Sequence, residues 1–279
     1  MQVDSIAEQL FFTTVRIDTI DVAGEAGAGT GFFFALKRGD VNHPFIVTNK
    51  HVVEGMRSGR LTLLKRDGDN PLVGQGFPAD IIDWSTAWFG HPDPSIDIAI
   101  LPLAPLEAQI KQRTGTDFFY RYVLAEMIPT VDEFARLDAI EQVTFVGYPD
   151  GIWDSKNLLP VARRGTTASP LQVDFENTPC FLIDASVFGG SSGSPVFILN
   201  QGMFTDKTGN TMVGSRLLFI GVVAAVFCRT QLNQIIPVPI PTQTQPMAQQ
   251  QEMIDLGIVF KASTVVQAAD AFLAAKGVA

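Results

Sequence analysis

Residues 188–195 read Phe-Gly-Gly-Ser-Ser-Gly-Ser-Pro. Glycines precede and follow Ser192, and residues without a Cβ allow a tight turn in which backbone N–H groups point at one spot. We expect the amides of Gly190 and Ser192 to be the two donors, and Pro195 to begin the next strand. Taken alone, the stretch also fits an ordinary surface loop rich in Gly and Ser. Its meaning therefore depends on the residues that accompany it elsewhere in the chain.

Two polar residues upstream supply that context. His51 lies within Thr-Asn-Lys-His-Val-Val, and Asp97 opens the apolar run Asp-Ile-Ala-Ile-Leu. A serine hydroxyl becomes a strong nucleophile when an imidazole takes its proton and a carboxylate holds that imidazole in the correct tautomer. The order His51, Asp97, Ser192 along the chain therefore predicts a catalytic triad. Asp93 is the competing carboxylate, but Asp97 adjoins a buried run, where a carboxylate is desolvated beside an imidazole.

No metal or other cofactor is predicted. Besides His51, the histidines are His43 and His91, which both stand directly before proline in segments that read as surface turns. A zinc site needs several His, Cys or carboxylate ligands at defined spacing, and Cys180 and Cys228 are distant in sequence from both histidines. With two cysteines, the sequence indicates reduced core thiols rather than a disulfide framework.

Composition narrows the class of protein. The 279 residues are 46% hydrophobic and 18% charged, which is typical of a globular chain rather than a disordered one. A net charge of -9 argues against binding nucleic acid, because phosphate backbones require clustered Lys and Arg. Residues 1–10 contain Asp4 and Glu8 and do not read as a signal peptide, and no apolar run has membrane-spanning length. We therefore expect a cytoplasmic protein that contacts neither nucleic acid nor membrane.

Short segments rich in Val, Ile, Phe and Thr, separated by Gly, Pro, Asn and Asp, predict β-strands. Six lie in the first part of the chain, at 11–17, 31–36, 45–48, 61–65, 79–84 and 96–103. Six more lie in the second part, at 142–147, 161–168, 181–184, 196–199, 218–227 and 257–261. Six strands in each half fit two small antiparallel β-barrels, so a mainly all-β protein is expected. The expected divisions are a first barrel at 1–104, a helical insertion at 105–140 and a second barrel at 141–279.

Four further segments differ in character from the strands. Helix formers at 106–112 and 131–137, the second capped by Thr130, predict short helices between the barrels. Apolar residues at helical spacing predict an amphipathic C-terminal helix over 263–276, with its first residue, a serine, as the cap. Residues 229–252 are rich in Gln and Pro without a core pattern, so a long mobile loop is expected there. That loop is either a passive excursion or a gate that substrate or a partner orders.

Five blocks of the chain together resemble the signatures of chymotrypsin-fold serine peptidases, most closely the bacterial, disulfide-free HtrA-like branch. They are Gly29–Phe32, Thr48–Val53, Asp97–Leu101, Gly147–Pro149 and Asp184–Pro195. The resemblance extends from about residue 11 to 276. It implies two perpendicular six-stranded β-barrels, with His51 and Asp97 on the first and Ser192 on the second. The chain departs from the family at Ser194, where Gly is common, and no PDZ-like module is expected after the second barrel.

The same resemblance implies a pocket for the substrate residue before the scissile bond. Its base falls at Ser186, and its wall includes Ala224, Ala225 and Val226. These side chains are uncharged, so a buried Lys or Arg of the substrate would have no partner there. Small or medium apolar residues are therefore the expected preference, although Val226 also fits an ordinary core position.

The expected function is a cofactor-free serine endopeptidase acting on proteins or peptides. Ser191 stands where trypsin-like zymogens have a carboxylate that pairs with a newly cut N-terminus, so control would come from loop order or a regulatory protein partner. Two alternatives remain open from sequence. One is a catalytically feeble binding or scaffold module on the same fold, and the other is an esterase that uses the same triad.

Overall fold

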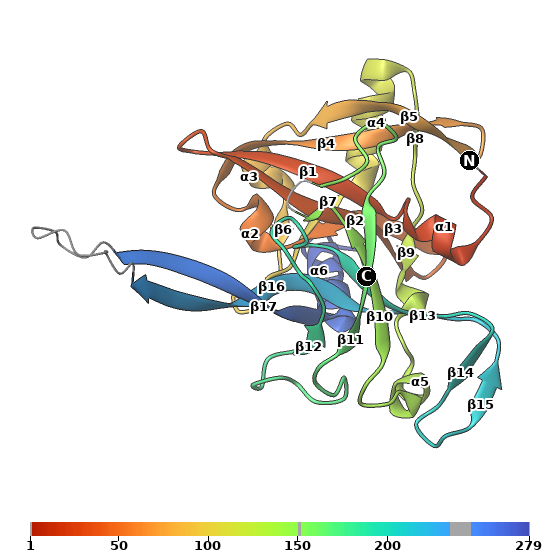
Figure 1. The fold of residues 1–279 in the computed structure, drawn as a ribbon. Helices are drawn as coiled ribbons and strands as arrows, with labels where there is room; N and C mark the ends of the chain where they lie inside the picture. Colours follow the sequence, from red (N-terminus) through yellow and green to blue (C-terminus); the bar gives the residue numbers. More distant parts are fainter. Residues whose placement is uncertain (1, 150–151, 235–246, 279) are drawn as a thin grey trace, which may run out of the picture.

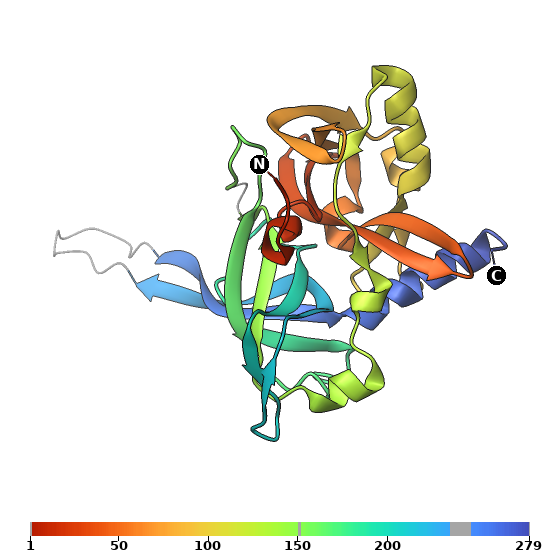
Figure 2. The ribbon, with the colours of Figure 1, turned by 90° about the vertical axis from the view of Figure 1, so that its right-hand side faces the viewer.

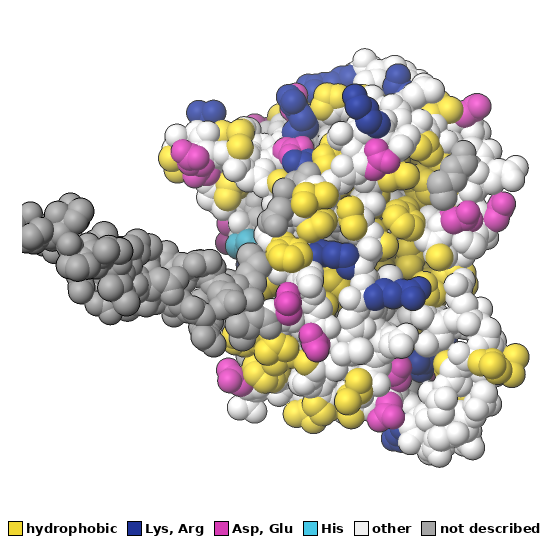
Figure 3. Space-filling model, in the orientation of Figure 1, with side chains coloured by type: hydrophobic (Ala, Val, Ile, Leu, Met, Phe, Trp, Pro, Cys, Tyr) yellow, Lys and Arg dark blue, Asp and Glu magenta, His cyan; other side chains and the backbone are white. Residues whose placement is uncertain are grey.

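The computed structural model describes residues 2–149, 152–234 and 247–278. Two β-structures, built from the N-terminal and C-terminal parts of the chain, pack against each other (Figure 1). The prediction of a mainly β, chymotrypsin-like architecture is confirmed, since one of the two is a closed six-stranded barrel and the other a larger sheet. On the face drawn in Figure 3, acidic and basic side chains are interspersed rather than gathered by sign.

The first sheet runs in the order β5-β4-β1-β2-β3-β7-β6. Its strands are β1 (Thr14–Asp21), β2 (Ala26–Arg38), β3 (Val41–Thr48), β4 (Met56–Asp67), β5 (Asn70–Asp80), β6 (Phe89–Gly90) and β7 (Ala99–Pro102). Side chains alternate between the faces of a strand, so Phe32 and Phe34 face one hydrophobic core and Phe33 faces another. The expected strand at 79–84 is cut short, because the chain leaves β5 and enters a short helix at Trp84.

This sheet has more strands than expected, because the segment between the two halves contributes two. β8 (Phe118–Phe119) pairs with β4, and β9 (Val123–Leu124) pairs in parallel with β2. The same segment holds α4 (Leu103–Thr114), the 3-10 turn η1 (Ala125–Met127) and α5 (Val131–Arg136). Thr130 caps α5, as its sequence predicts, and Glu133 completes a reciprocal capping box that was not predicted.

The second β-structure is a closed barrel in the order β10-β11-β12-β17-β16-β13. Its strands are β10 (Gln142–Gly147), β11 (Val161–Thr167), β12 (Cys180–Asp184), β13 (Pro195–Asn200), β16 (Arg216–Gln234) and β17 (Met247–Lys261), and β14 (Met203–Thr205) pairs with β15 (Thr211–Val213) beside it. The remaining short helices are α1 (Ile6–Leu10), α2 (Lys50–Val53) and α3 (Trp84–Ala87). In the described ranges, no helix is long and apolar enough to cross a bilayer.

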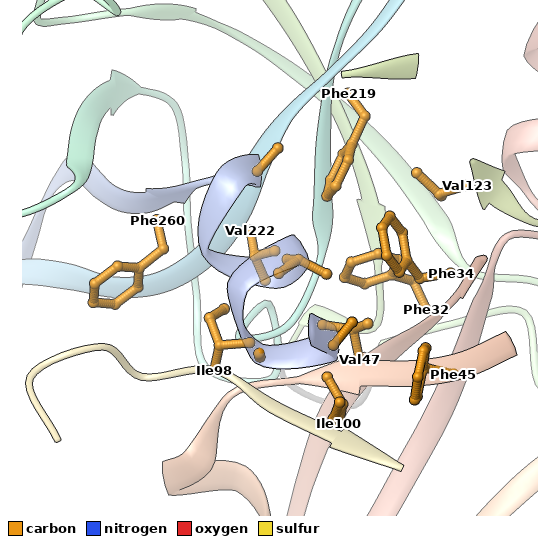
Figure 4. Close-up of a cluster of buried hydrophobic side chains, with 14 of the residues drawn as sticks. Phe32, Phe34, Phe45, Val47, Ile98, Ile100, Val123, Phe219, Val222 and Phe260 are labelled. Atoms are coloured by element: carbon orange, nitrogen blue, oxygen red, sulfur yellow. The ribbon is translucent and has the colours of Figure 1, made fainter. Parts of the chain in front are cut away.

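A single hydrophobic core joins the two halves (Figure 4). Phe32 and Phe45 of the first sheet and Phe219 and Val222 of the barrel are all buried in it. The rings of Phe32 and Phe219 meet edge to face with their centroids 5.4 Å apart. Packing of this kind holds the halves in one relative position, so that residues from both can build one site.

The C-terminal helix α6 (Ala262–Ala275) lies against both halves (Figure 2). Its buried residues include Val265, Ala269 and Leu273, in agreement with the predicted apolar stripe. The predicted Ser263 cap is wrong, because β17 runs directly into the helix and Lys261 occupies the N-cap position without a side-chain bond.

The expected loop at 229–252 is wrong over much of its length. β16 and β17 continue as a paired hairpin as far as Gln234 and Met247, and this hairpin projects away from the barrel (Figure 1). Backbone hydrogen bonds between two strands need no apolar side chains, so the lack of a core pattern did not exclude strands. Residues 235–246 lie outside the described residues.

Candidate active site

His51 and Asp97 meet at one end of the paired strands β3 and β7. His51 lies in α2, which begins directly after β3, and Asp97 precedes β7 between the buried side chains of Ile96 and Ile98. The Nδ1 atom of His51 lies 2.5 Å from Asp97 Oδ2, and the backbone N–H of His51 donates to Oδ1 at 3.1 Å. A carboxylate accepts hydrogen bonds, so this contact favours the tautomer of the neutral His51 ring with its proton on Nδ1 and a lone pair on Nε2. The two side chains are 50% and 28% exposed, so the carboxylate is less buried than the sequence suggested.

Asn49 and Lys50, which directly precede His51, hydrogen-bond to the segment that carries Asp97. The side-chain amide of Asn49 donates to the Asp97 carbonyl at 2.6 Å, and Lys50 Nζ donates to the Asp93 carbonyl at 3.0 Å. Both bonds tie the start of α2 to the segment that carries Asp97.

The competing carboxylate, Asp93, is hydrogen-bonded to Ser95. Its Oδ1 accepts from the backbone N–H and the hydroxyl of Ser95 at 2.9 and 2.7 Å. Both bonds hold the pKa of the Asp93 carboxyl below its usual value, and the bond from the Ser95 hydroxyl has the larger effect. In the described part of the chain no bond joins Asp93 to His51, and of the two carboxylates Asp97 is the one against the imidazole.

Ser192 is partly buried in the turn that precedes β13. Its Oγ donates to the carbonyl of Ala224 in β16 at 3.3 Å. No hydrogen bond between Ser192 and His51 occurs among the described residues. The structure therefore joins two of the three predicted catalytic side chains and leaves the serine hydroxyl turned to a neighbouring strand.

The turn before Ser192 is closed by a bond from the Ser191 N–H to the Phe188 carbonyl, at 3.1 Å. Gly190 is the third residue of this turn and has φ of +77°, a value that glycine adopts without strain and that a type II turn requires. Within the ranges the structure describes, neither the Gly190 nor the Ser192 amide donates to a protein acceptor. Both predicted donors are thus left to solvent or a bound molecule.

Thr30 of β2 ties this turn to the first sheet, a role the sequence did not reveal. Its N–H donates to the Ser192 carbonyl at 2.9 Å, and its hydroxyl donates to the Gly190 carbonyl at 2.9 Å. The same hydroxyl accepts from the Tyr148 N–H at 3.0 Å. Gly193 has φ of +87°, and a Cβ there would lie 1.8 Å from the Thr30 carbonyl oxygen. The glycine is needed because two backbones touch at this point.

We expect Thr30→Val to lower kcat/KM by about tenfold to a hundredfold, because a buried hydrogen-bonded hydroxyl is worth about 1–3 kcal/mol when its partners lose it. Thr19→Val is the matched control, since Thr19 is also buried, on β1, and makes no hydrogen bond to the turn among the described residues. Steady-state kinetics and thermal unfolding of both variants check this. Equal activity losses in the two variants would contradict a specific role for Thr30.

The predicted pocket residues differ in exposure. Ala224 is buried, and Ala225 is exposed. Val226 packs against the barrel core, which fits the alternative that it is an ordinary core residue. The side chain of Ser186 is exposed, while its carbonyl accepts a bond from Nη1 of Arg163 at 2.7 Å. The sequence did not predict that the cationic Arg163 would lie beside Ser186, the expected base of the pocket.

His91 is not the surface residue that its neighbouring prolines suggested. It is 7% exposed, its Nδ1 accepts the Asp93 N–H at 3.0 Å, and its Nε2 lies 3.2 Å from Gln267 Oε1. The ring is buried because its loop packs against α6. Among the described residues, no cluster of three or more His, Cys, Asp or Glu side chains could hold a metal ion. Cys180 is a free, buried thiol whose pKa is raised by burial.

The chain belongs to the family of trypsin-like peptidase domains, whose model matches residues 29–204. That span contains His51, Asp97 and Ser192 with the elements that position them. The protein is accordingly a trypsin-like serine endopeptidase, as its sequence predicted. No curated protein matches the chain.

Solved structures with a similar arrangement include serine proteases. The active form of a protease from M. tuberculosis is 19% identical with a TM-score of 0.46, over 94% of this chain and 81% of that one. A serine endoprotease from Yersinia pestis is 14% identical with a TM-score of 0.45, over 94% of this chain and 62% of that one. A thermostable serine protease from an extremophilic microorganism is 14% identical with a TM-score of 0.47, over 92% and 95%. The family assignment stands on the matched domain alone.

Proposed function

We propose that the chain hydrolyses peptide bonds with Ser192 as nucleophile, His51 as general base and then general acid, and Asp97 as the group that orients His51. The observation that supports this is the 2.5 Å pairing of His51 Nδ1 with Asp97, in a member of the trypsin-like peptidase family. The feeble binding module and the esterase lack an observation of their own that favours them.

The reaction begins when the Ser192 hydroxyl leaves the Ala224 carbonyl and donates to His51 Nε2. The bond that it gives up is 3.3 Å long, and a neutral hydrogen bond contributes about 1 kcal/mol, so breaking it costs little. Oγ then attacks the scissile carbonyl carbon while its proton passes to Nε2. The imidazolium gives that proton to the leaving amine, and an ester of Ser192 remains. A water molecule repeats the sequence and releases the acyl product.

The developing oxyanion is stabilised by the amides of Gly190 and Ser192. These donors are held by the turn and by the bonds of Thr30 to the carbonyls of the same two residues. Donors already in place cost no reorganisation when the charge forms, and losing one costs about a hundredfold to a thousandfold in turnover.

Substrate selection follows from the uncharged residues Ser186, Ala224, Ala225 and Val226, which favour a small or medium apolar side chain before the scissile bond. Residues 1–104 supply His51 and Asp97, and residues 141–279 supply Ser192. The segment 105–140 links the two and adds strands to the first sheet.

A fluorophosphonate probe tests the nucleophile, and a pair of substrates tests the reaction class. We expect the probe to label wild-type protein at Ser192, as mapped by mass spectrometry, and to leave Ser192→Ala unlabelled. Casein should be cleaved at internal bonds. Turnover of small esters without cleavage of casein or peptides would instead favour the esterase, and absence of both labelling and turnover would favour the binding module.

A further inference from the structure

Arg163 holds the polypeptide that leads to Ser192 at two points. The residue lies on β11, and its Nη1 donates to the Ser186 carbonyl at 2.7 Å while Nη2 donates to the Ser191 hydroxyl at 2.6 Å. The first acceptor, Ser186, begins the segment that leads to Ser192, and the second acceptor, Ser191, ends it. Ser192 follows directly. The guanidinium therefore spans the segment whose shape decides where the Gly190 and Ser192 amides point.

The barrel holds this guanidinium in a defined place. Arg163 stands opposite Phe145 across the β10–β11 ladder, and its guanidinium carbon lies 4.5 Å from the centre of that ring. A cation over an aromatic face is attracted to it, so this contact restrains the position of the guanidinium. The clamp is thus anchored on a strand and reaches out to the turn.

Ser191 is the buried end of the clamp. Its side chain is 0% exposed, and its Oγ also accepts the Phe188 N–H at 3.2 Å. The hydroxyl oxygen thereby uses both lone pairs, one for the turn's own backbone and one for Arg163. A lysine would supply a point charge without a rigid fork, so it could not reproduce both bonds with the same geometry.

We propose that Arg163 is a positioning residue that locks the turn from Ser186 to Ser191 into the shape the oxyanion site needs. This rests on the proposed function, in which the Gly190 and Ser192 amides stabilise the reaction. Charge-assisted hydrogen bonds from a guanidinium are about twice as strong as neutral ones, and two of them on one short turn restrict its alternatives strongly. Losing the clamp lets the turn sample other conformations while the core of the barrel stays intact.

The experiment compares Arg163→Met with Arg164→Met. Arg164 is the next residue on β11, its side chain is exposed and points to the other face of the strand, and it lines a hollow with Thr144 and Asn200, apart from the turn. In Arg163→Met we expect kcat to fall by about a hundredfold, the loss typical of a missing oxyanion donor, with a smaller change in KM. Arg164→Met should keep wild-type kinetics. Arg163→Lys should stay close to Arg163→Met, and methylguanidine should restore part of the activity of Arg163→Ala.

Hydrogen–deuterium exchange provides a readout that does not depend on catalysis. In Arg163→Met the amides of residues 186–194 should exchange about tenfold faster, with other barrel strands unchanged, whereas Arg164→Met should match the wild type. Unchanged exchange in that segment would overturn the proposal even if the wild type had no peptidase activity. If Arg163→Met exchanged faster but the wild type had no peptidase activity, the clamp would stand and the proposed function would be rejected.

A second variant covers the case in which Arg163→Met does not fold. Ser191→Ala removes the buried acceptor and keeps the arginine, so it should show the same fall in kcat and the same faster exchange of residues 186–194. Where both variants fold, the double variant should lose less than the sum of the two single losses, since both variants delete the bond between Arg163 and Ser191. Wild-type kinetics and exchange in Ser191→Ala, or fully additive losses in the double variant, would overturn the clamp.

Discussion

Ser192→Ala should lose nearly all peptidase activity, with kcat falling roughly a million-fold as in other triad enzymes stripped of their nucleophile. Folding should be nearly unaffected, because the Ser192 hydroxyl makes one hydrogen bond within the described part of the chain, the 3.3 Å contact with the Ala224 carbonyl. Active-site-normalised kinetics on a peptide substrate measure the loss, and thermal unfolding measures stability. The residual rate should be about the same when His51→Ala is added, since the triad works as a unit.

Ser194→Ala is the matched control for that variant. It makes the same chemical change two residues away, on a side chain that is 0% exposed and whose hydroxyl has no bonding partner among the described residues. Removing a buried hydroxyl of this kind should leave stability equal or slightly higher and activity close to wild type. Wild-type turnover in Ser192→Ala, or a comparable loss in Ser194→Ala, would contradict the assignment of the nucleophile.

The sequence was informative wherever neighbours along the chain decide the structure. The turn at Ser192 depends on Gly190 and Gly193, which adopt positive φ, and Thr130 caps α5 through a residue three positions on. Glycine and capping signals are local, so one sequence is enough to read them. The apolar run after Asp97 likewise indicated a buried strand, and β7 begins two residues after Asp97.

Other features depend on residues that are far apart and could not be predicted in this way. Thr30 and Arg163 reach the turn from β2 and β11, and neither residue has a local pattern that indicates such a contact. His91 is buried because α6 covers its loop, although its own neighbours resemble a surface turn. The direction of the Ser192 hydroxyl is set by the Ala224 carbonyl of β16, which is again a tertiary contact.

The second large effect is expected for Asp97→Asn, which should lower kcat by roughly 10,000-fold while the fold is retained. The geometry gives the reason. The backbone N–H of His51 donates to Oδ1 of Asp97, so in Asp97→Asn the side-chain oxygen would be needed at that position. Its NH2 group would then face His51 Nδ1 and donate to it. The imidazole would have to carry its own proton on Nε2, where the wild type accepts the proton of Ser192.

Nitrogen NMR of His51 distinguishes this explanation from a simple loss of charge. The wild type should show the Nδ1–H tautomer and Asp97→Asn the Nε2–H tautomer, with kcat reduced and KM little changed. Asp93→Asn is the control, because an amide oxygen can still accept from Ser95 as Asp93 Oδ1 does, so turnover should stay near wild type. An inactive Asp93→Asn beside an active Asp97→Asn would reverse the choice of carboxylate. A low kcat with an unchanged tautomer would mean that Asp97 acts through its charge alone, because the imidazole would still present a free Nε2 to the serine.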